Sequence, residues 1–174
     1  MQKAEAIIVR PENAANPEER SAIGSINEAA FGGPEEADLV DNLRASGDVL
    51  LSLVAEYEAH AAGHIVFSRM WIEQAGGLIP AVALAPMAVL PEYQRRGIGG
   101  ALIRRGLEVL GALDEKIVIV VGHPNYYPRF GFSCEKARHL ESPFPAEALM
   151  AIELRDGALD GIRGRVIYPA AFGI

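Results

Sequence analysis

Residues 94–100, with the sequence QRRGIGG, combine two arginines with three glycines. Glycines let a ligand approach the main chain closely, and arginine guanidiniums match the oxygens of phosphate groups. Because the loop follows a strand-like run and opens a helical pattern, its N–H groups would lie at the positive end of a helix dipole. These residues predict a diphosphate site, although a glycine-rich turn with solvated arginines would have the same sequence.

Two familiar phosphate-binding loops do not fit. A P-loop ends in Gly-Lys-Ser or Gly-Lys-Thr, whereas Ala101 and Leu102 follow Gly100 here. The dinucleotide fingerprint Gly-x-Gly-x-x-Gly needs a third glycine, but Leu102 stands at that position after Gly97 and Gly99. A nucleotide-binding module of either kind is therefore disfavoured.

Other reactive side chains give weaker signals. The single cysteine, Cys134, allows no intrachain disulfide, which fits a reducing cytoplasm, and a lone thiol more often packs than reacts. His60 and His64 are four residues apart, but Gly63 and a predicted hairpin argue against a helical metal pair, so we expect no metal. The absence of a Gly-x-Ser-x-Gly stretch disfavours a serine hydrolase.

The elements that must position the loop follow from hydrophobic patterning and cap residues. Asn16 and Pro17 suit the start of a helix, and Pro86 requires a bulge or a break in the pairing of its strand. We expect strands over 6–10, 48–58, 60–70, 78–90 and 116–122, and helices over 17–31, 34–47 and 97–111. The 78–90 and 116–122 strands with the helix between them predict one right-handed parallel crossover.

The rest of the chain predicts a short helical turn within 123–132 and two strands joined by a glycine-rich connection, a hairpin-like end. The sum is an α/β (α+β) chain, with a mixed sheet and helices on its faces. The length of 174 residues suggests one domain over 1–174, with a core over about 6–155 and a C-terminal strand extension over 156–174.

Composition narrows the function classes. Half of the residues are hydrophobic, as in globular proteins, and the net charge of −7 argues against nucleic-acid and anionic-membrane partners and mildly favours an amine. The N-terminus lacks a basic-then-apolar signal pattern, and the longest uncharged run, residues 74–91, contains Pro80 and Pro86. We therefore expect a soluble cytoplasmic protein.

Three separated motifs resemble those of the GNAT-type N-acetyltransferases. Residues 94–99 match the family pattern Gln/Arg-x-x-Gly-x-Gly/Ala, and residues 87–93 resemble the end of the family's strand four. Tyr127, Gly131 and Phe132 resemble its Tyr-x-x-x-Gly-Phe. The segments 122–132 and 150–172 look like a branch of predicted bacterial N-acetyltransferases without a settled substrate.

The resemblance implies the GNAT fold, a mostly antiparallel sheet splayed between strands four and five, with acetyl-CoA as acetyl donor. It implies direct transfer in a ternary complex to a primary amine of a small molecule or a peptide. Pantetheine would fill the splay near Pro86, and one main-chain N–H there would stabilise the oxyanion. The residues implied to bind the cofactor are Met87, Ala88, Val89, Gln94, Arg95, Arg96, Gly97, Ile98, Gly99, Gly100, Ala101 and Asn125.

The resemblance also makes Tyr127 the general acid for the leaving thiolate, with a phenol pKa near 10. Pro128 is a departure, because a residue before proline avoids helical dihedral angles. His123 is a candidate base, or it caps the short helix. The glutamate that some members carry as base on strand four is replaced by Ala83. Further candidates are Glu28, Glu56, Glu58 and His64, although His64 also fits a satisfied core or cleft histidine.

Two questions stay open at this level. A non-catalytic acyl-CoA-binding or regulatory domain of the same fold would carry the same cofactor motifs. The family selects its acceptor with the first two helices and with the regions that here lie around Phe31, Trp71 and the last strands. These residues do not indicate which amine is the acceptor. A homodimer is also an open alternative.

Overall fold

Residues 6–174 are described in the computed structural model, and within them eight strands form a mixed sheet. The strand order is β1-β2-β3-β4-β5-β7, and β8 joins through β3 and β6. The strands are β1 (Ile8–Pro11), β2 (Val49–Tyr57), β3 (His60–Gln74), β4 (Gly77–Val89), β5 (Ile117–Val121), β6 (Leu140–Glu141), β7 (Leu149–Glu153) and β8 (Gly164–Ile167). The helices are α1 (Pro17–Phe31), α2 (Glu35–Ser46) and α3 (Ile98–Ala112), with 3-10 turns η1 (Pro91–Tyr93), η2 (Tyr127–Phe130) and η3 (Ala170–Phe172).

The pairing confirms the predicted fold class. β4 runs parallel to β5, with α3 between them in the chain, as the crossover prediction requires. The β1–β2, β3–β8 and β5–β7 pairs are antiparallel. Within residues 6–174, no helix is both long and apolar enough to cross a membrane.

Two compact units make up the chain, and each combines two segments. The first unit contains the residues up to Val66 together with Pro86–Gly106, and so holds the glycine loop. The second contains Phe67–Ala85 together with Leu107–Ile174, and so holds Tyr127. The extent of a single domain with a C-terminal extension stays a prediction.

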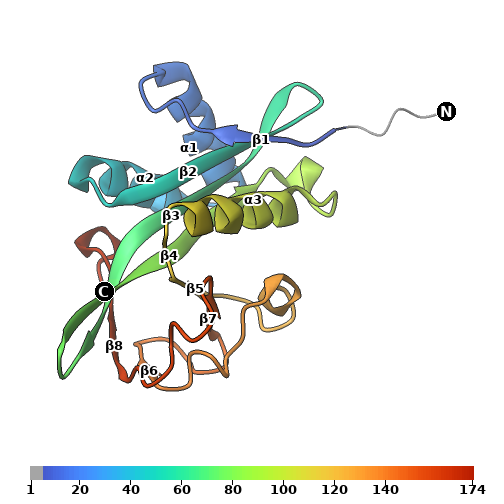
Figure 1. Ribbon diagram of the computed structural model, residues 1–174. Helices are drawn as coiled ribbons and strands as arrows, with labels where there is room; N and C mark the ends of the chain where they lie inside the picture. The colour runs from blue at the N-terminus through green and yellow to red at the C-terminus, as the bar shows by residue number, and fades with distance from the viewer. Residues whose placement is uncertain (1–5) are drawn as a thin grey trace. The chain divides into compact units, whose positions relative to one another are not determined.

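Cap residues set the helices of the first unit. The Asn16 side chain accepts a hydrogen bond from the Glu18 N–H at 3.0 Å, and Pro17 occupies the first turn of α1, as predicted. Gly32, at φ 80°, ends α1 in the left-handed conformation, and Gly47 ends α2 in the same way. The chain therefore turns directly from α1 into α2, and the two helices contact each other (Figure 1).

Helices cover both faces of β3 in the first unit. A Cβ added to Gly63 would lie 2.9 Å from Cγ2 of Ile98, so this face of β3 packs against α3. The next residue, His64, directs its ring to Asn27 of α1. Because successive strand residues face opposite sides, α1 and α3 lie on opposite faces, as expected.

The second unit has an apolar core built from β3, β4, β5, β7 and β8. Its buried side chains include Met70, Ile72, Ala81, Ala83, Ile117, Ile119, Leu149, Ala151 and Val166. β7 pairs with β5 along the whole of both strands, from Ile117 opposite Glu153 to Val121 opposite Leu149. Burial on both sides explains why the β5 sequence is continuously apolar.

The predicted hairpin-like end is wrong. β7 and β8 are consecutive in the chain, but β7 pairs with β5, and β8 pairs with β3 and β6. The connection over 154–163 is too long for a tight turn to impose pairing, so each strand bonds to a different strand edge. Gly164 permits the β3–β8 contact, because a Cβ there would lie 2.1 Å from the carbonyl oxygen of Glu73.

We predict that Gly164→Ala lowers the midpoint of thermal unfolding, because the clash is with main chain that cannot move aside. Gly24→Ala is the matched control, since Gly24 lies within α1 and a Cβ there meets no atom within 4 Å. We expect that control to stabilise the protein by about 0.5–1 kcal/mol through helix propensity. Equal unfolding midpoints for the two variants would contradict the close β3–β8 packing.

Candidate functional site

The last residues of β4 alternate in the direction of their main-chain groups. The Leu90 N–H donates to the carbonyl of Ala62 on β3 at 2.8 Å, whereas the Val89 carbonyl accepts from Nε2 of Gln94 at 3.1 Å. In an extended strand, alternate residues direct their N–H and C=O groups to the same side. Met87 and Val89 therefore direct theirs away from β3, and Ala88 directs its own toward β3.

The pairing of β4 with β5 is short. Val82 pairs with Val118 and Ala83 with Ile119, so the ladder ends three residues before Pro86. β5 itself continues to Val121 and keeps its pairing with β7. The break in pairing predicted from the proline is thus found, beginning a few residues before it, and it leaves β4 main-chain groups available for another partner.

The glycine loop has the backbone of an anion site. Arg95 and Gly97 both adopt left-handed conformations, with φ of 64° and 85°. The first described bond of α3 is from the Ala101 N–H to the Gly97 carbonyl at 3.0 Å. The N–H groups of the first helical turn, Ile98 to Gly100, have no acceptor within the helix. No acidic residue occupies that turn, so the positive end of the helix dipole is not neutralised there.

The two arginines of the loop have different surroundings. The Arg96 guanidinium lies over the rings of Tyr57 and Tyr93, at 5.5 and 5.9 Å from their centroids, and donates to the Tyr57 hydroxyl at 3.4 Å. Arg95 is exposed on the loop. Tyr57, which ends β2, was not singled out from the sequence, because a tyrosine at the end of an apolar strand looks like an ordinary core residue.

In the second unit, Tyr127 begins η2 and is partly buried. Its ring meets the rings of Tyr126 and Phe132 edge-on, with centroids 5.1 and 5.8 Å away. Burial, and to a lesser degree the neighbouring Tyr126, raise the pKa of the Tyr127 phenol to about 12. The sequence-based value near 10 was too low, because it ignored the loss of solvation. The phenol thus stays protonated at physiological pH.

His123 and Asn125 are exposed between β5 and η2. The His123 carbonyl accepts from the Tyr126 N–H at 3.1 Å, which closes a turn. Tyr126 occupies the N-cap of η2 without a side-chain capping bond. His123 therefore shapes this turn through its main chain, and the structure shows no capping of η2 by its imidazole among the described residues.

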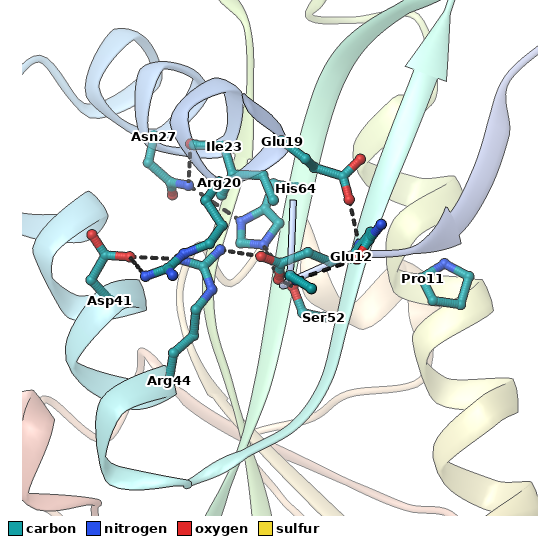
Figure 2. Close-up of polar contacts among 12 residues, drawn as sticks. Pro11, Glu12, Glu19, Arg20, Ile23, Asn27, Asp41, Arg44, Ser52 and His64 are labelled. Carbon is teal, nitrogen blue, oxygen red and sulfur yellow. Dashed lines mark hydrogen bonds and ion pairs between the residues drawn. The ribbon is translucent and has the colours of Figure 1, made fainter. Parts of the chain in front are cut away.

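His64 lies in a buried polar network of the first unit that the sequence did not reveal (Figure 2). The Asn27 amide donates to the Ile23 carbonyl at 3.0 Å, which fixes its orientation, and Nδ2 also contacts Nδ1 of His64 at 3.3 Å. Nδ1 is therefore an acceptor, and Nε2–H donates to Ser52 Oγ at 2.9 Å. Because both ring nitrogens are engaged, His64 is a satisfied core histidine.

The network continues from Ser52 to charged residues. The Ser52 hydroxyl donates to Glu12, whose other oxygen accepts from Arg44, and Arg44 also pairs with Asp41 at 2.6 Å. Burial is the main cause that lowers the pKa of His64 to about 3, and the positive charge of Arg44 adds to it. A neutral imidazole agrees with the hydrogen-bond directions. The network thus joins α1, α2, β2 and β3 to the residue that follows β1.

A cavity of about 610 Å³ lies beside this network in the first unit. Glu12, Arg44 and Ser52 line it, with apolar residues at the start of β2. No residue of the predicted cofactor loop lines it. Among the other base candidates, Glu56 pairs with Arg10 at 3.0 Å, and Glu28 lines a separate polar groove between α1 and α2.

The family follows from comparison with known proteins. The acetyltransferase (GNAT) domain model matches residues 49–134. The Escherichia coli protein called uncharacterized N-acetyltransferase YjhQ is 43% identical over 128 residues, 72% of this chain and 71% of that protein. The chain belongs to the GNAT family. The predicted family and enzyme class are thereby confirmed.

Two crystal structures of GNAT proteins are similar to this protein over nearly the whole of its chain. The Escherichia coli N-acetyltransferase YhbS in complex with CoA is 29% identical with a TM-score of 0.89, covering 100% of this chain and 96% of that one. A GNAT acetyltransferase from Brucella melitensis in complex with acetyl-CoA is 33% identical with a TM-score of 0.78, covering 96% and 98%. Both confirm the predicted GNAT fold.

Within the GNAT fold, the first unit brings together the predicted residues from Met87 to Ala101, at the end of β4 and the start of α3. The second unit brings together His123, Asn125 and Tyr127 in the ten residues after β5. Their roles in binding and catalysis stay predictions. Gly122, which contacts the Tyr127 ring, was missed, because nothing in the sequence marks which glycine faces a ring.

We predict that His64 makes the protein less stable at acid pH. The folded state keeps His64 neutral down to about pH 3, whereas the unfolded state binds a proton below its ordinary pKa of 6.5. Stability contributed by neutral His64 is therefore lost as pH falls from 6.5 toward 3, by at most about 1.4 kcal/mol per pH unit.

The measurement is the free energy of unfolding in urea at several pH values for wild type and His64→Gln. The difference between the two should shrink as pH falls through this range. His60→Gln, an exposed position on the same strand, is the control and should follow wild type. A constant difference between wild type and His64→Gln would contradict the neutral buried imidazole.

Proposed function

We propose that this GNAT chain is an acetyl-CoA-dependent N-acetyltransferase that transfers an acetyl group directly to a primary amine in a ternary complex. The observation that supports this most is the first unit's run of available main-chain donors. The run begins with the main-chain N–H groups of Met87 and Val89, which point away from β3. It continues with the N–H groups of the first turn of α3. CoA carries amides and a diphosphate in the same molecule, so these two kinds of donor suit it. The YhbS and Brucella structures contain CoA and acetyl-CoA.

The roles in binding follow from the donor chemistry. The N–H groups of Ile98, Gly99 and Gly100 would hold the diphosphate, with Arg95 adding charge-assisted hydrogen bonds. Main-chain groups of Met87 would pair with the pantetheine amides. The Val89 N–H is the donor assigned to the oxyanion, because its carbonyl is already engaged by Gln94. Arg96, held by Tyr57 and Tyr93, would support the shape and charge of the loop.

In the transfer step, the amine nitrogen attacks the thioester carbonyl carbon, the new C–N bond forms and the C–S bond breaks. The sulfur leaves with the bonding electron pair, and Tyr127 donates its phenolic proton to it. Tyr127 then regains a proton from solvent, and the proton lost by the amine passes to His123 or to water. The raised pKa of Tyr127 keeps the acid loaded. A desolvated thiolate is a stronger base for the same physical reason, so the proton transfer stays feasible.

The acceptor is proposed only as a primary amine, on a small molecule or a peptide. The net charge of −7 would favour a cationic amine over an anionic acceptor. We place the reaction in the cytoplasm on the basis of the single cysteine.

The decisive test is thiol release from acetyl-CoA with a panel of primary amines, alongside calorimetric binding of CoA. We expect CoA to bind and at least one amine to release stoichiometric thiol and acetylated product. Binding without thiol release for any amine would support the non-catalytic acyl-CoA-binding domain instead. No binding of CoA would overturn both.

We predict that Gly99→Leu weakens CoA binding about tenfold or more. A leucine side chain would keep the diphosphate from approaching the N–H groups of the loop closely. Loss of even one charge-assisted hydrogen bond costs about 1.5–3 kcal/mol of binding free energy. The matched control is Gly111→Leu in the same helix, where a Cβ meets no atom within 4 Å. Calorimetry should show wild-type affinity for that control. Unchanged affinity in folded Gly99→Leu would remove the loop from the binding site.

We predict that Tyr127→Phe lowers kcat by about 10²-fold, the usual size of a general-acid effect, with little change in the KM for acetyl-CoA. Tyr126→Phe is the neighbouring control and should keep kcat. In wild type, ionisation of Tyr127 should not reduce the rate at pH values well below its pKa of about 12. Full turnover by Tyr127→Phe would exclude the phenol from the reaction.

A further inference from the structure

Gly122 follows β5 directly, and its backbone does not explain why the residue is glycine. Its N–H donates to the Ala148 carbonyl at 3.0 Å, which extends the pairing beyond the end of β5. Its φ lies outside the left-handed range, so an L-residue could adopt this conformation. The requirement for glycine must come from the space around it.

That space is filled by the ring of Tyr127. A Cβ on Gly122 would lie 2.3 Å from Cε2, 2.8 Å from Cδ2 and 3.4 Å from Cζ of Tyr127. The first two distances are shorter than any ordinary carbon–carbon contact. Even alanine, the smallest residue with a Cβ, would therefore have to displace the ring.

The ring has little freedom to move aside, because aromatic neighbours contact it. Phe132, which is 1% exposed, lies edge-on with its centroid 5.8 Å away, and Tyr126 lies edge-on at 5.1 Å. Tyr126 is itself held by Arg129, whose guanidinium lies 4.6 Å from the ring centroid and whose Nε donates to the Tyr126 carbonyl at 3.3 Å. Pro128 follows Tyr127 and restricts the backbone on its other side.

We propose that Gly122 is a positioning residue for Tyr127: its missing side chain is the space in which the phenol ring lies. The close approach to the end of β5 fixes the ring plane, and so the direction of the hydroxyl. The same approach contributes to the burial of the phenol. This assignment rests on the proposed role of Tyr127 as the general acid.

The catalytic test compares Gly122→Ala with Gly111→Ala, a control glycine with open space around its Cβ position. We expect Gly122→Ala to lower kcat about tenfold or more while the KM for acetyl-CoA stays within about twofold. Gly111→Ala should keep both constants. In the Tyr127→Phe background, Gly122→Ala should cause no further loss of kcat. An unchanged kcat in Gly122→Ala, or a full additional loss in the double variant, would overturn the proposal.

A second readout does not depend on catalysis. Each of the five tyrosines gives a ring signal in the NMR spectrum of protein labelled with ¹³C-tyrosine, and Tyr127→Phe identifies the Tyr127 signal by its absence. Gly122→Ala should shift that signal and lower the phenol pKa from about 12 toward its ordinary value, because the ring becomes more exposed. The signals of Tyr57 and Tyr93 should not move. An unshifted Tyr127 signal overturns the positioning role, whereas full turnover by Tyr127→Phe overturns only the acid role.

Failure of Gly122→Ala to fold would still be informative, because Tyr127→Ala removes the ring atoms that clash. The double variant Gly122→Ala/Tyr127→Ala should then fold with the unfolding midpoint of Tyr127→Ala alone. A double variant that also fails to fold, while Tyr127→Ala folds, would show that Gly122 is needed for another contact and would overturn the proposal.

Discussion

The hydrogen-bonding capacity of the β4 main chain is the constraint on which the candidate cofactor site depends. A buried N–H or C=O group needs a partner, and β4 changes partners along its length. Its described pairs with β5 end before Pro86, while Leu90 still bonds to β3. Met87 and Val89 thus keep main-chain groups that face away from β3. The left-handed Arg95 and Gly97 then turn the chain so that α3 starts with further donors.

A different constraint governs the helical side of the first unit. Glu12, Arg44, Asn27 and His64 are polar groups in an apolar environment, and each would be destabilising without its partners. Their hydrogen bonds form a chain with one direction, from the Asn27 amide through His64 and Ser52 to Glu12. Burial is the main reason that His64 is neutral, and the direction of this chain agrees with a neutral imidazole. The network therefore specifies how α1 and α2 pack on the strands, and it leaves His64 without a free nitrogen for catalysis.

Much of the fold could be predicted from local sequence signals. Asn16 and Pro17 mark the start of α1, Gly47 marks the end of α2, and the apolar run before the glycine loop marks β4. The pairing of β7 and β8 could not be predicted, because two strands that follow each other need not bond when a long connection separates them. The pKa of Tyr127 was also out of reach, because it depends on how far the ring is removed from water.

The sequence by itself determined the family and the residue types available for chemistry. The GNAT motifs are residues at fixed spacings along the chain, so they can be recognised without knowledge of the fold. The sequence located the glycine loop, Tyr127 and the proline that marks the break in pairing. Only the tertiary structure decided which groups are available within each unit. It showed that the main-chain groups of Val89, and not those of Ala88, point away from β3. It also showed that Tyr57 and Tyr93 contact the Arg96 guanidinium, and that Gly122 leaves space for the Tyr127 ring. These contacts are between residues that are distant in the sequence or whose orientation the sequence does not specify. They depend on contact distance and burial in the folded chain, and residue type alone does not predict them.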